Sequence, residues 1–240
     1  VDNIGDRISE EAGPAGDDIV LSSVSFAFPA HVQELVLTGN AAIDATGNSG
    51  INVLRGNGAA NLLNGGGGPD AMVGGDGNDI YIVDHAGDIV SEAAGEGVDL
   101  VKSTVTLALS QNVEKLTLRG GAAIDGTGND LANTLAGNAA ANTLDGGAGS
   151  DKLIGNGGND TYVVDHLADQ AIETSSGGGT DTVLASVSYT LGEHIEALTL
   201  TGGGAIDGTG NDGANTLSGN AAANILDGGR GNDTLVGGGG

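Results

Sequence analysis

The sequence predicts an all-β fold, a parallel β-solenoid in which short strands alternate with glycine-rich turns. Three observations predict it. A nine-residue motif recurs in register, a longer period of about 81 residues contains that motif, and no stretch shows sustained helical periodicity with caps. Nine residues are too few to bury a core alone, so the repeats must stack on one another.

Five nonapeptides carry the complete inner motif, a glycine-rich turn followed by a short apolar strand. Glycine permits the sharp turn, and the strand points its central residue inward. Two nonapeptides make one coil, and coils stacked about 4.8 Å apart pair their backbone groups. The sixth positions of these five are Asp70, Asp79, Asp151, Asp160 and Asp233, and the eighth positions are Met72, Tyr81, Leu153, Tyr162 and Leu235.

The outer period divides the chain into three copies, 1–82, 83–163 and 164–240, which open with the dipeptide Val-Asp. We expect one continuous solenoid over residues 1–240, excised from a longer array. Between the nonapeptides, VSYTL (187–191) and EALTLTG (196–202) alternate apolar and polar residues as strands do. The segment 84–97 is compatible with a short helix, but its flanking glycines favour turn and strand.

The composition is strongly acidic, with Lys+Arg 7 against Asp+Glu 32 and a formal net charge of -25. Such a chain lacks the basic footprint of a nucleic-acid-binding protein. It is either a disordered acidic linker or a fold whose carboxylates await cations. The periodic placement of its apolar residues favours the second interpretation.

Several classes of protein are disfavoured by what the sequence lacks. It has no cysteine, so neither disulfides nor thiolate metal sites can form. No apolar run approaches the length of a membrane span, so we expect no membrane insertion, and the segment VDNIGDRISE does not resemble a signal peptide. No GxSxG, HExxH or P-loop motif occurs, and repeated equivalent carboxylates suit structural ligands better than one catalytic pocket. We therefore predict a protein that is not an enzyme.

The spacing of the turns predicts which carboxylates meet. Turns on one side of the solenoid are two nonapeptides apart, and oxygen ligands from stacked turns suit a hard cation such as Ca²⁺. This count pairs Asp70 with Asp88 and Asp151 with Asp169. It gives Asp79 only Asn61 as a partner, and Asp160 only Asn142, so we expect these sites to bind more weakly. Asp6 and Asp233 remain as half-sites.

The tandem GGxGxD turns, each followed by a large apolar residue two positions later, resemble the RTX or hemolysin-type calcium-binding repeat. That resemblance implies a parallel β-roll with right-handed coils, stabilised by several Ca²⁺ ions. It also implies that backbone carbonyls complete the sites, those of Gly66 and Gly68 facing Val83 and His85, and those of Gly147 and Gly149 facing Val164 and His166. Asn replaces Asp in half of the turns, and Pro69 occupies a fifth position, which departs from the family pattern.

The resemblance also implies a cellular setting. We expect a module of a secreted or surface-attached RTX-like protein of a Gram-negative bacterium, exported by type I secretion, that folds on calcium outside the cell and serves as a structural spacer. End-to-end self-association through the half-sites is a further expectation. The alternative is an accessory module of a secreted hydrolase or epimerase, or a carbohydrate-binding adhesin face. It would require an exposed aromatic or carboxylate cluster in a single copy, which the sequence does not reveal.

Overall fold

The computed structural model describes residues 1–10, 18–174 and 178–240. They form two compact units, Val1–Lys115 and Leu116–Gly240. The regular elements of the described residues are short β-strands, which pair in parallel. The predicted parallel β-solenoid is confirmed, and the segment 84–97 is turn and strand. The continuity of three copies in one array stays a prediction.

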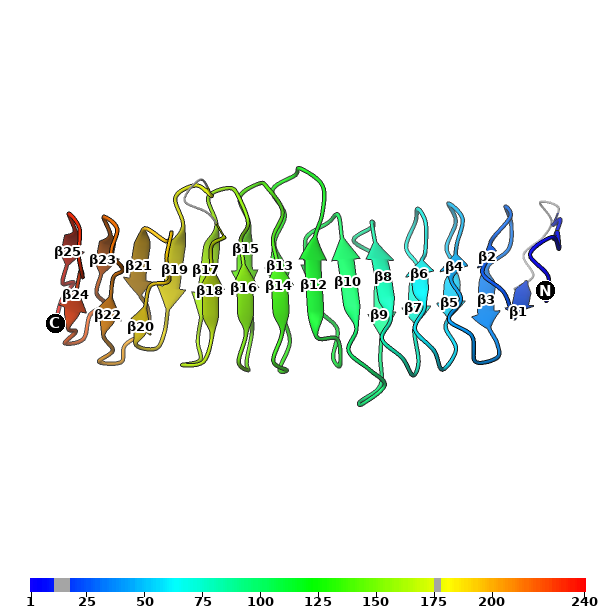
Figure 1. The fold of residues 1–240 in the computed structure, drawn as a ribbon, viewed down its shortest axis with the longest axis horizontal. Coiled ribbons are helices and arrows are strands. Elements are labelled where there is room, and N and C mark those ends of the chain that lie inside the picture. The colour runs from blue at the N-terminus through cyan, green and yellow to red at the C-terminus, as the bar shows by residue number, and fades with distance from the viewer. Residues whose placement is uncertain (11–17, 175–177) are drawn as a thin grey trace. The chain divides into compact units, whose positions relative to one another are not determined.

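In the first unit, successive strands alternate between two sheets, so each coil contributes one strand to each sheet (Figure 1). One sheet has the order β1 (Ile19–Ser22), β3 (Glu34–Leu37), β5 (Val53–Arg55), β7 (Ala71–Val73) and β9 (Ile89–Ser91). The other contains β2 (Phe26–Ala27), β4 (Ala45–Thr46), β6 (Leu62–Asn64), β8 (Ile80–Val83) and β10 (Leu100–Ser103). The last strand of the unit is β11 (Leu107–Ala108).

The second unit repeats this alternation. Its longest run of paired strands is β13 (Gly126–Thr127), β15 (Thr143–Asp145), β17 (Thr161–Val164), β19 (Thr182–Ala185), β21 (Ala197–Leu200), β23 (Thr216–Ser218) and β25 (Thr234–Val236). Opposite lie first β12 (Lys115–Leu118), β14 (Thr134–Ala136), β16 (Lys152–Ile154) and β18 (Gln170–Ile172), and then β20 (Tyr189–Thr190), β22 (Gly208–Thr209) and β24 (Leu226–Asp227).

The core of each unit is a set of side-chain ladders that run from coil to coil. In the first unit Leu63 stacks on Tyr81, and Tyr81 on Val101. All three side chains are at most 1 % exposed. Burying one such residue stabilises a fold by about 1.5–3 kcal/mol. The ladder in the second unit runs Leu144, Tyr162, Val183, Leu198, Leu217 and Leu235.

The spacing of stacked residues is not constant. Most neighbours among the nonapeptides are eighteen positions apart, as Leu63 and Tyr81 are. Tyr81 and Val101 are twenty apart, and Tyr162 and Val183 are twenty-one apart. The extra residues lie in the connections from β9 to β10 and from β18 to β19, which positions the acidic clusters described below. The described residues contain no helix long and apolar enough to cross a membrane.

Candidate metal centres

Hydrogen bonds between sixth-position residues tie the stacked turns together. The amide of Asn52 donates to Oδ1 of Asp70 (2.8 Å), and the amide of Asp70 donates to Oδ1 of Asp88 (3.0 Å). The second unit repeats this with Asp151, whose amide donates to Oδ1 of Asp169 (2.9 Å). The structure thus brings together the two Asp–Asp pairs that the spacing predicted. Their role as metal ligands stays a prediction.

One carboxylate oxygen of Asp70 accepts no hydrogen bond from the described residues. Oδ1 accepts the Asn52 amide, but Oδ2 is buried and has no hydrogen-bond partner among the described residues, and the same holds for Asp151. Burial raises the pKa of Asp70 to about 6, and the nearby charges of Asp88 and Asp84 add to the rise. A buried oxygen without a partner is costly, so this atom suits a cation ligand.

Asp88 uses both of its oxygens within the fold. Oδ1 accepts the amide of Asp70, and Oδ2 accepts the amides of Asp84 and His85 (both 3.1 Å). Asp169 makes the same contacts, and Asp6 closes its own turn in this way. Both carboxylate oxygens of Asp88 thus accept hydrogen bonds already, whereas Asp70 keeps one oxygen without a partner among the described residues. The two aspartates of the pair are therefore not equally available to a cation.

The carbonyls that the resemblance assigned to these sites are partly engaged. The carbonyl of His85 accepts the amide of Asp88 (3.0 Å), and that of Val83 accepts the amide of Thr104 (3.0 Å). His166 and Val164 behave alike. Gly66 has φ +84°, and a Cβ there would collide with the carbonyl oxygen of Asn48, so glycine at this position lets that carbonyl point between the turns.

A second arrangement surrounds Asp79. Its Oδ1 accepts the amide of Asn61 (2.7 Å), and its own amide donates to Oδ1 of Asp99 (2.7 Å). Glu92 follows β9 and accepts a hydrogen bond from the hydroxyl of Tyr81. Ligand oxygens of Asp79, Glu92 and Asp99 lie within 4.8 Å of one another, and we call these three residues the first acidic triad.

The second unit holds a matching cluster, the second acidic triad. It consists of Asp160, Glu173 and Asp181, with the Tyr162 hydroxyl bonded to Glu173. The amide of Asp160 donates to Oδ1 of Asp181 (2.7 Å). In both triads every carboxylate keeps one buried oxygen that has no partner among the described residues.

The triads are costly to ionise. Burial raises the pKa of Glu92 to about 8 and of Glu173 to about 7, and neighbouring carboxylates raise both further. Burial also raises the pKa of Asp79 to about 6 and, in the same direction, the pKa of Asp99. Three negative charges can share such a space only if a cation joins them.

A family model for the RTX calcium-binding nonapeptide repeat matches residues 46–81, 127–162 and 209–240. The chain carries RTX calcium-binding repeats. No curated protein and no solved structure matches it. The matched segments contain the Asp70, Asp79, Asp151, Asp160 and Asp233 turns, whereas Glu92, Asp99, Glu173 and Asp181 follow them.

The prediction that Asp79 and Asp160 have only Asn partners is wrong. The eighteen-residue spacing would stack Gly97 on Asp79. The connection from β9 to β10 is longer than that spacing assumes, so Asp99 stacks on Asp79 instead. Glu92 was missed because it lies outside the nine-residue pattern and turns inward from the end of β9. The signal that was available is the recurrence of this glutamate and aspartate, in equivalent places, as Glu173 and Asp181.

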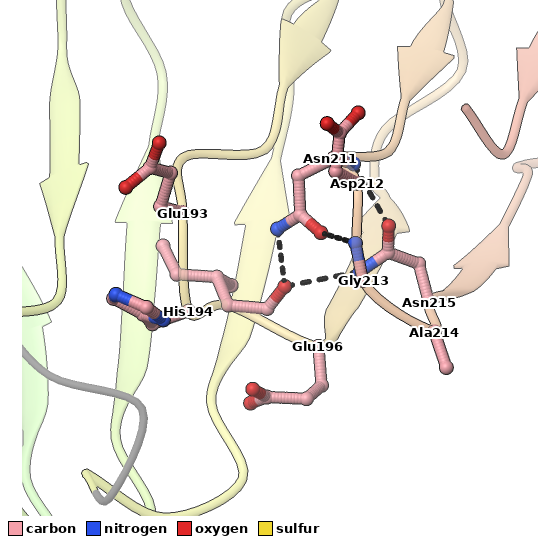
Figure 2. Close-up of a pocket in the computed structure, with 9 residues that line it drawn as sticks. Glu193, His194, Glu196, Asn211, Asp212, Gly213, Ala214 and Asn215 are labelled. Atoms are coloured by element: carbon pink, nitrogen blue, oxygen red, sulfur yellow. Dashed lines mark hydrogen bonds between the residues drawn. The ribbon is translucent and has the colours of Figure 1, made fainter. Parts of the chain in front are cut away.

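The RTX turns that carry Asn are closed by side-chain amides. Figure 2 shows Asn211 and Asn215, whose Nδ2 atoms donate to the carbonyl of Ile195 (2.9 and 3.1 Å). Asn61 likewise donates to the carbonyl of Ile43 (2.6 Å), while its Oδ1 accepts the amide of Asn57 (2.9 Å). Asn142 repeats both bonds. In these turns the Asn side-chain amides are thus engaged in hydrogen bonds within the fold.

Asp233 follows the same rule as the other sixth-position aspartates, because its Oδ1 accepts the amide of Asn215 (2.9 Å). It is only half-buried.

A cleft of about 300 Å³ lies beside the turn of Asn211 and Asn215, and Glu193, Glu196 and Asp212 line it (Figure 2). The matching cleft in the first unit has Ala30, Gln33 and Ser49 at those positions. Glu196 accepts the amide of Asp181 (2.9 Å), and Asp212 pairs with Arg230 (3.3 Å). Two of the three acids thus have partners within the fold, so the cleft gives the enzymatic or carbohydrate-binding alternative little support.

Proposed function

We propose that this chain is a calcium-binding repeat module whose stacked RTX turns bind Ca²⁺ and are stabilised by it. The carrying observation is Oδ2 of Asp70 and of Asp151, which is buried, has no hydrogen-bond partner in the described part of the chain, and belongs to an aspartate that is bonded to a second aspartate of the next turn. Oxygen-only surroundings suit Ca²⁺, which takes six to eight oxygen ligands. The proposed side-chain ligands are the predicted pairs Asp70 with Asp88 and Asp151 with Asp169.

The charge balance supports this proposal. With a net charge of -25, the chain repels itself unless its carboxylates are neutralised. Among the described residues, the ion pairs Arg55–Glu34 and Arg230–Asp212 involve exposed arginines and none of the sixth-position aspartates. A ligand that binds the folded state and not the unfolded chain stabilises the fold by an amount that grows with the logarithm of its free concentration.

The test is a calcium titration of the whole chain after removal of metal, followed by circular dichroism. We expect calcium to increase the β-sheet signal. Asp70→Asn with Asp151→Asn should raise the calcium concentration needed for half of the change by about tenfold, which corresponds to about 1.4 kcal/mol. Asp76→Asn with Asp130→Asn, exposed aspartates at third positions of the turns, is the matched control. A fully β spectrum that calcium leaves unchanged would contradict the proposal.

The cellular role follows from the same chemistry. RTX repeats are typical of extracellular or secreted proteins of Gram-negative bacteria. A chain that needs calcium stays extended where free calcium is scarce and folds where it is abundant. We infer that the module is exported by type I secretion and acts as a structural spacer of a larger secreted or surface protein. Secretion of a reporter fused to this chain would test that role.

A further inference from the structure

We propose that the two acidic triads are a second class of calcium site, separate from the stacked-turn sites. Each would hold one Ca²⁺ ion between two stacked connections, of which one contributes Asp79 or Asp160 and the next contributes the other two carboxylates. This inference deepens the proposed function but rests on different residues, because Asp70 and Asp151 take no part in it. The two claims can therefore fail separately.

The first argument is how the oxygens are shared. Oδ1 of Asp79 accepts the amide of Asn61, Oδ1 of Asp99 accepts the amide of Asp79, and Oε1 of Glu92 accepts the hydroxyl of Tyr81. One oxygen of each carboxylate thus fixes its side chain. The second oxygens have no partner among the described residues, and the three side chains are at most 8 % exposed. The cluster is more than an acidic patch, because its free oxygens are buried.

The second argument is the space above Gly74. A Cβ at this glycine would collide with Oδ2 of Asp79, the hydroxyl of Tyr81 and Oε1 of Glu92. Gly155 has the same three kinds of neighbour in the second unit. At Gly65, the equivalent position of a stacked-turn site, the three nearest atoms all belong to Asp70. Tyrosine and glutamate are therefore specific to the triads.

The third argument concerns the kind of ion. All ligands offered are oxygens, which select hard cations over zinc or copper. Three carboxylates can supply between three and six oxygens, and Ca²⁺ accepts such variable coordination at about 2.3–2.6 Å, whereas Mg²⁺ demands near-ideal octahedral geometry and retains its waters. The structure therefore favours Ca²⁺ over Mg²⁺ in the triads.

The experiment combines ion counting with terbium luminescence on the whole chain. The chain has no Trp and three Tyr, and two of these, Tyr81 and Tyr162, contact triad glutamates. Terbium bound in a triad should show tyrosine-sensitised emission. Glu92→Gln with Glu173→Gln should remove two ions per chain in equilibrium dialysis, one for each triad, and most of this emission. Asp70→Asn with Asp151→Asn should keep most of the emission.

Three outcomes overturn this proposal alone. One is an unchanged ion count and unchanged emission in the glutamine variant, which would leave the proposed function intact. Another is wild-type protein that folds with terbium but shows no tyrosine-sensitised emission, a result that needs no variant to fold. The third is emission that is lost in Tyr189→Phe but kept in Tyr81→Phe with Tyr162→Phe. Wild-type protein that binds no calcium at all contradicts both claims. Asp99→Asn with Asp181→Asn serves as the second variant pair, with the same expected loss.

Discussion

The amide of Asp79 donates a 2.7 Å hydrogen bond to Oδ1 of Asp99, although Asp99 lies twenty positions further along the chain and not eighteen. The second unit makes the same bond over twenty-one positions, from Asp160 to Asp181. The turn contact is thus kept while the connection after β9 or β18 changes length. The longer connection leaves room for a glutamate to turn inward beneath the aspartates.

Gly74→Ala with Gly155→Ala should destabilise the folded protein by about 1–3 kcal/mol, because the added methyl groups collide with triad oxygens. Gly67→Ala is the control, since a Cβ there meets nothing within 4 Å and φ lies outside the left-handed region. It should change stability by less than about 0.5 kcal/mol. Thermal unfolding in saturating calcium measures both effects, and equal effects would show that the triad space is not crowded.

Much of the fold was predictable because it follows one local rule. The nine-residue period alone predicts the inward-facing Tyr81 and Leu63, and the structure stacks them. The same count predicts the contact between Asp70 and Asp88, since exactly repeated turns cannot place those residues elsewhere.

The triads were not predictable in this way, because they depend on a break in the rule. The count from Asp79 leads to Gly97, and only the three-dimensional path of the chain after β9 shows that Asp99 takes that place. The role of Asn48 was hidden for a related reason. Its Nδ2 donates to the carbonyls of Pro29 and Val32 (2.9 and 3.0 Å), which belong to a loop outside the repeat.

Asn48→Ala with Asn211→Ala should destabilise the protein whether or not calcium is present. Each substitution leaves one half-buried carbonyl, that of Pro29 or Gly192, without its side-chain amide. It also removes one of the two amides that donate to the carbonyl of Val32 or Ile195, and we expect a cost of about 1–3 kcal/mol per site. Asp70→Asn, by contrast, should act mainly in calcium. Unfolding in denaturant, with and without calcium, separates the two classes. An Asn48 effect confined to calcium would mean that this turn binds an ion.

The second unit should associate end to end in calcium. Its edge strand β25 leaves Leu235, the last member of the core ladder, 47 % exposed and Val236 51 % exposed. Such an edge offers a template for a strand of another molecule. Light scattering at rising protein concentration should show calcium-dependent growth in mass, which Leu235→Lys with Val236→Lys should suppress. A calcium-bound protein that stays monomeric at high concentration would contradict this expectation.

Acidity should affect the calcium-free and calcium-bound proteins in opposite directions. Burial raises the pKa of Asp79 from 3.8 to about 6 and that of Glu92 from 4.5 to about 8, so the folded state binds protons more tightly than the unfolded chain does. Stability of the calcium-free fold is therefore highest below about pH 4 and falls as the pH rises through that window to about pH 8.

In calcium the ion replaces those protons, so stability should rise over the same range. Unfolding temperatures at about pH 5, 6, 7 and 8, with and without calcium, measure both slopes.

General repulsion among the acids also lowers stability at high pH, so a variant of the triad glutamates is needed to separate this repulsion from the effect of the triads. Glu92→Gln with Glu173→Gln should flatten the dependence of calcium-free stability on pH above about pH 6. The reason is that burial raises the pKa of Glu92 to about 8 and the pKa of Glu173 to about 7, so both lose their protons in that range. Asp76→Asn, which removes an exposed carboxylate outside the triads, is the matched control for the loss of charge. An equal slope in wild type and the glutamine variant would mean that the triad glutamates are not the groups that take up the protons.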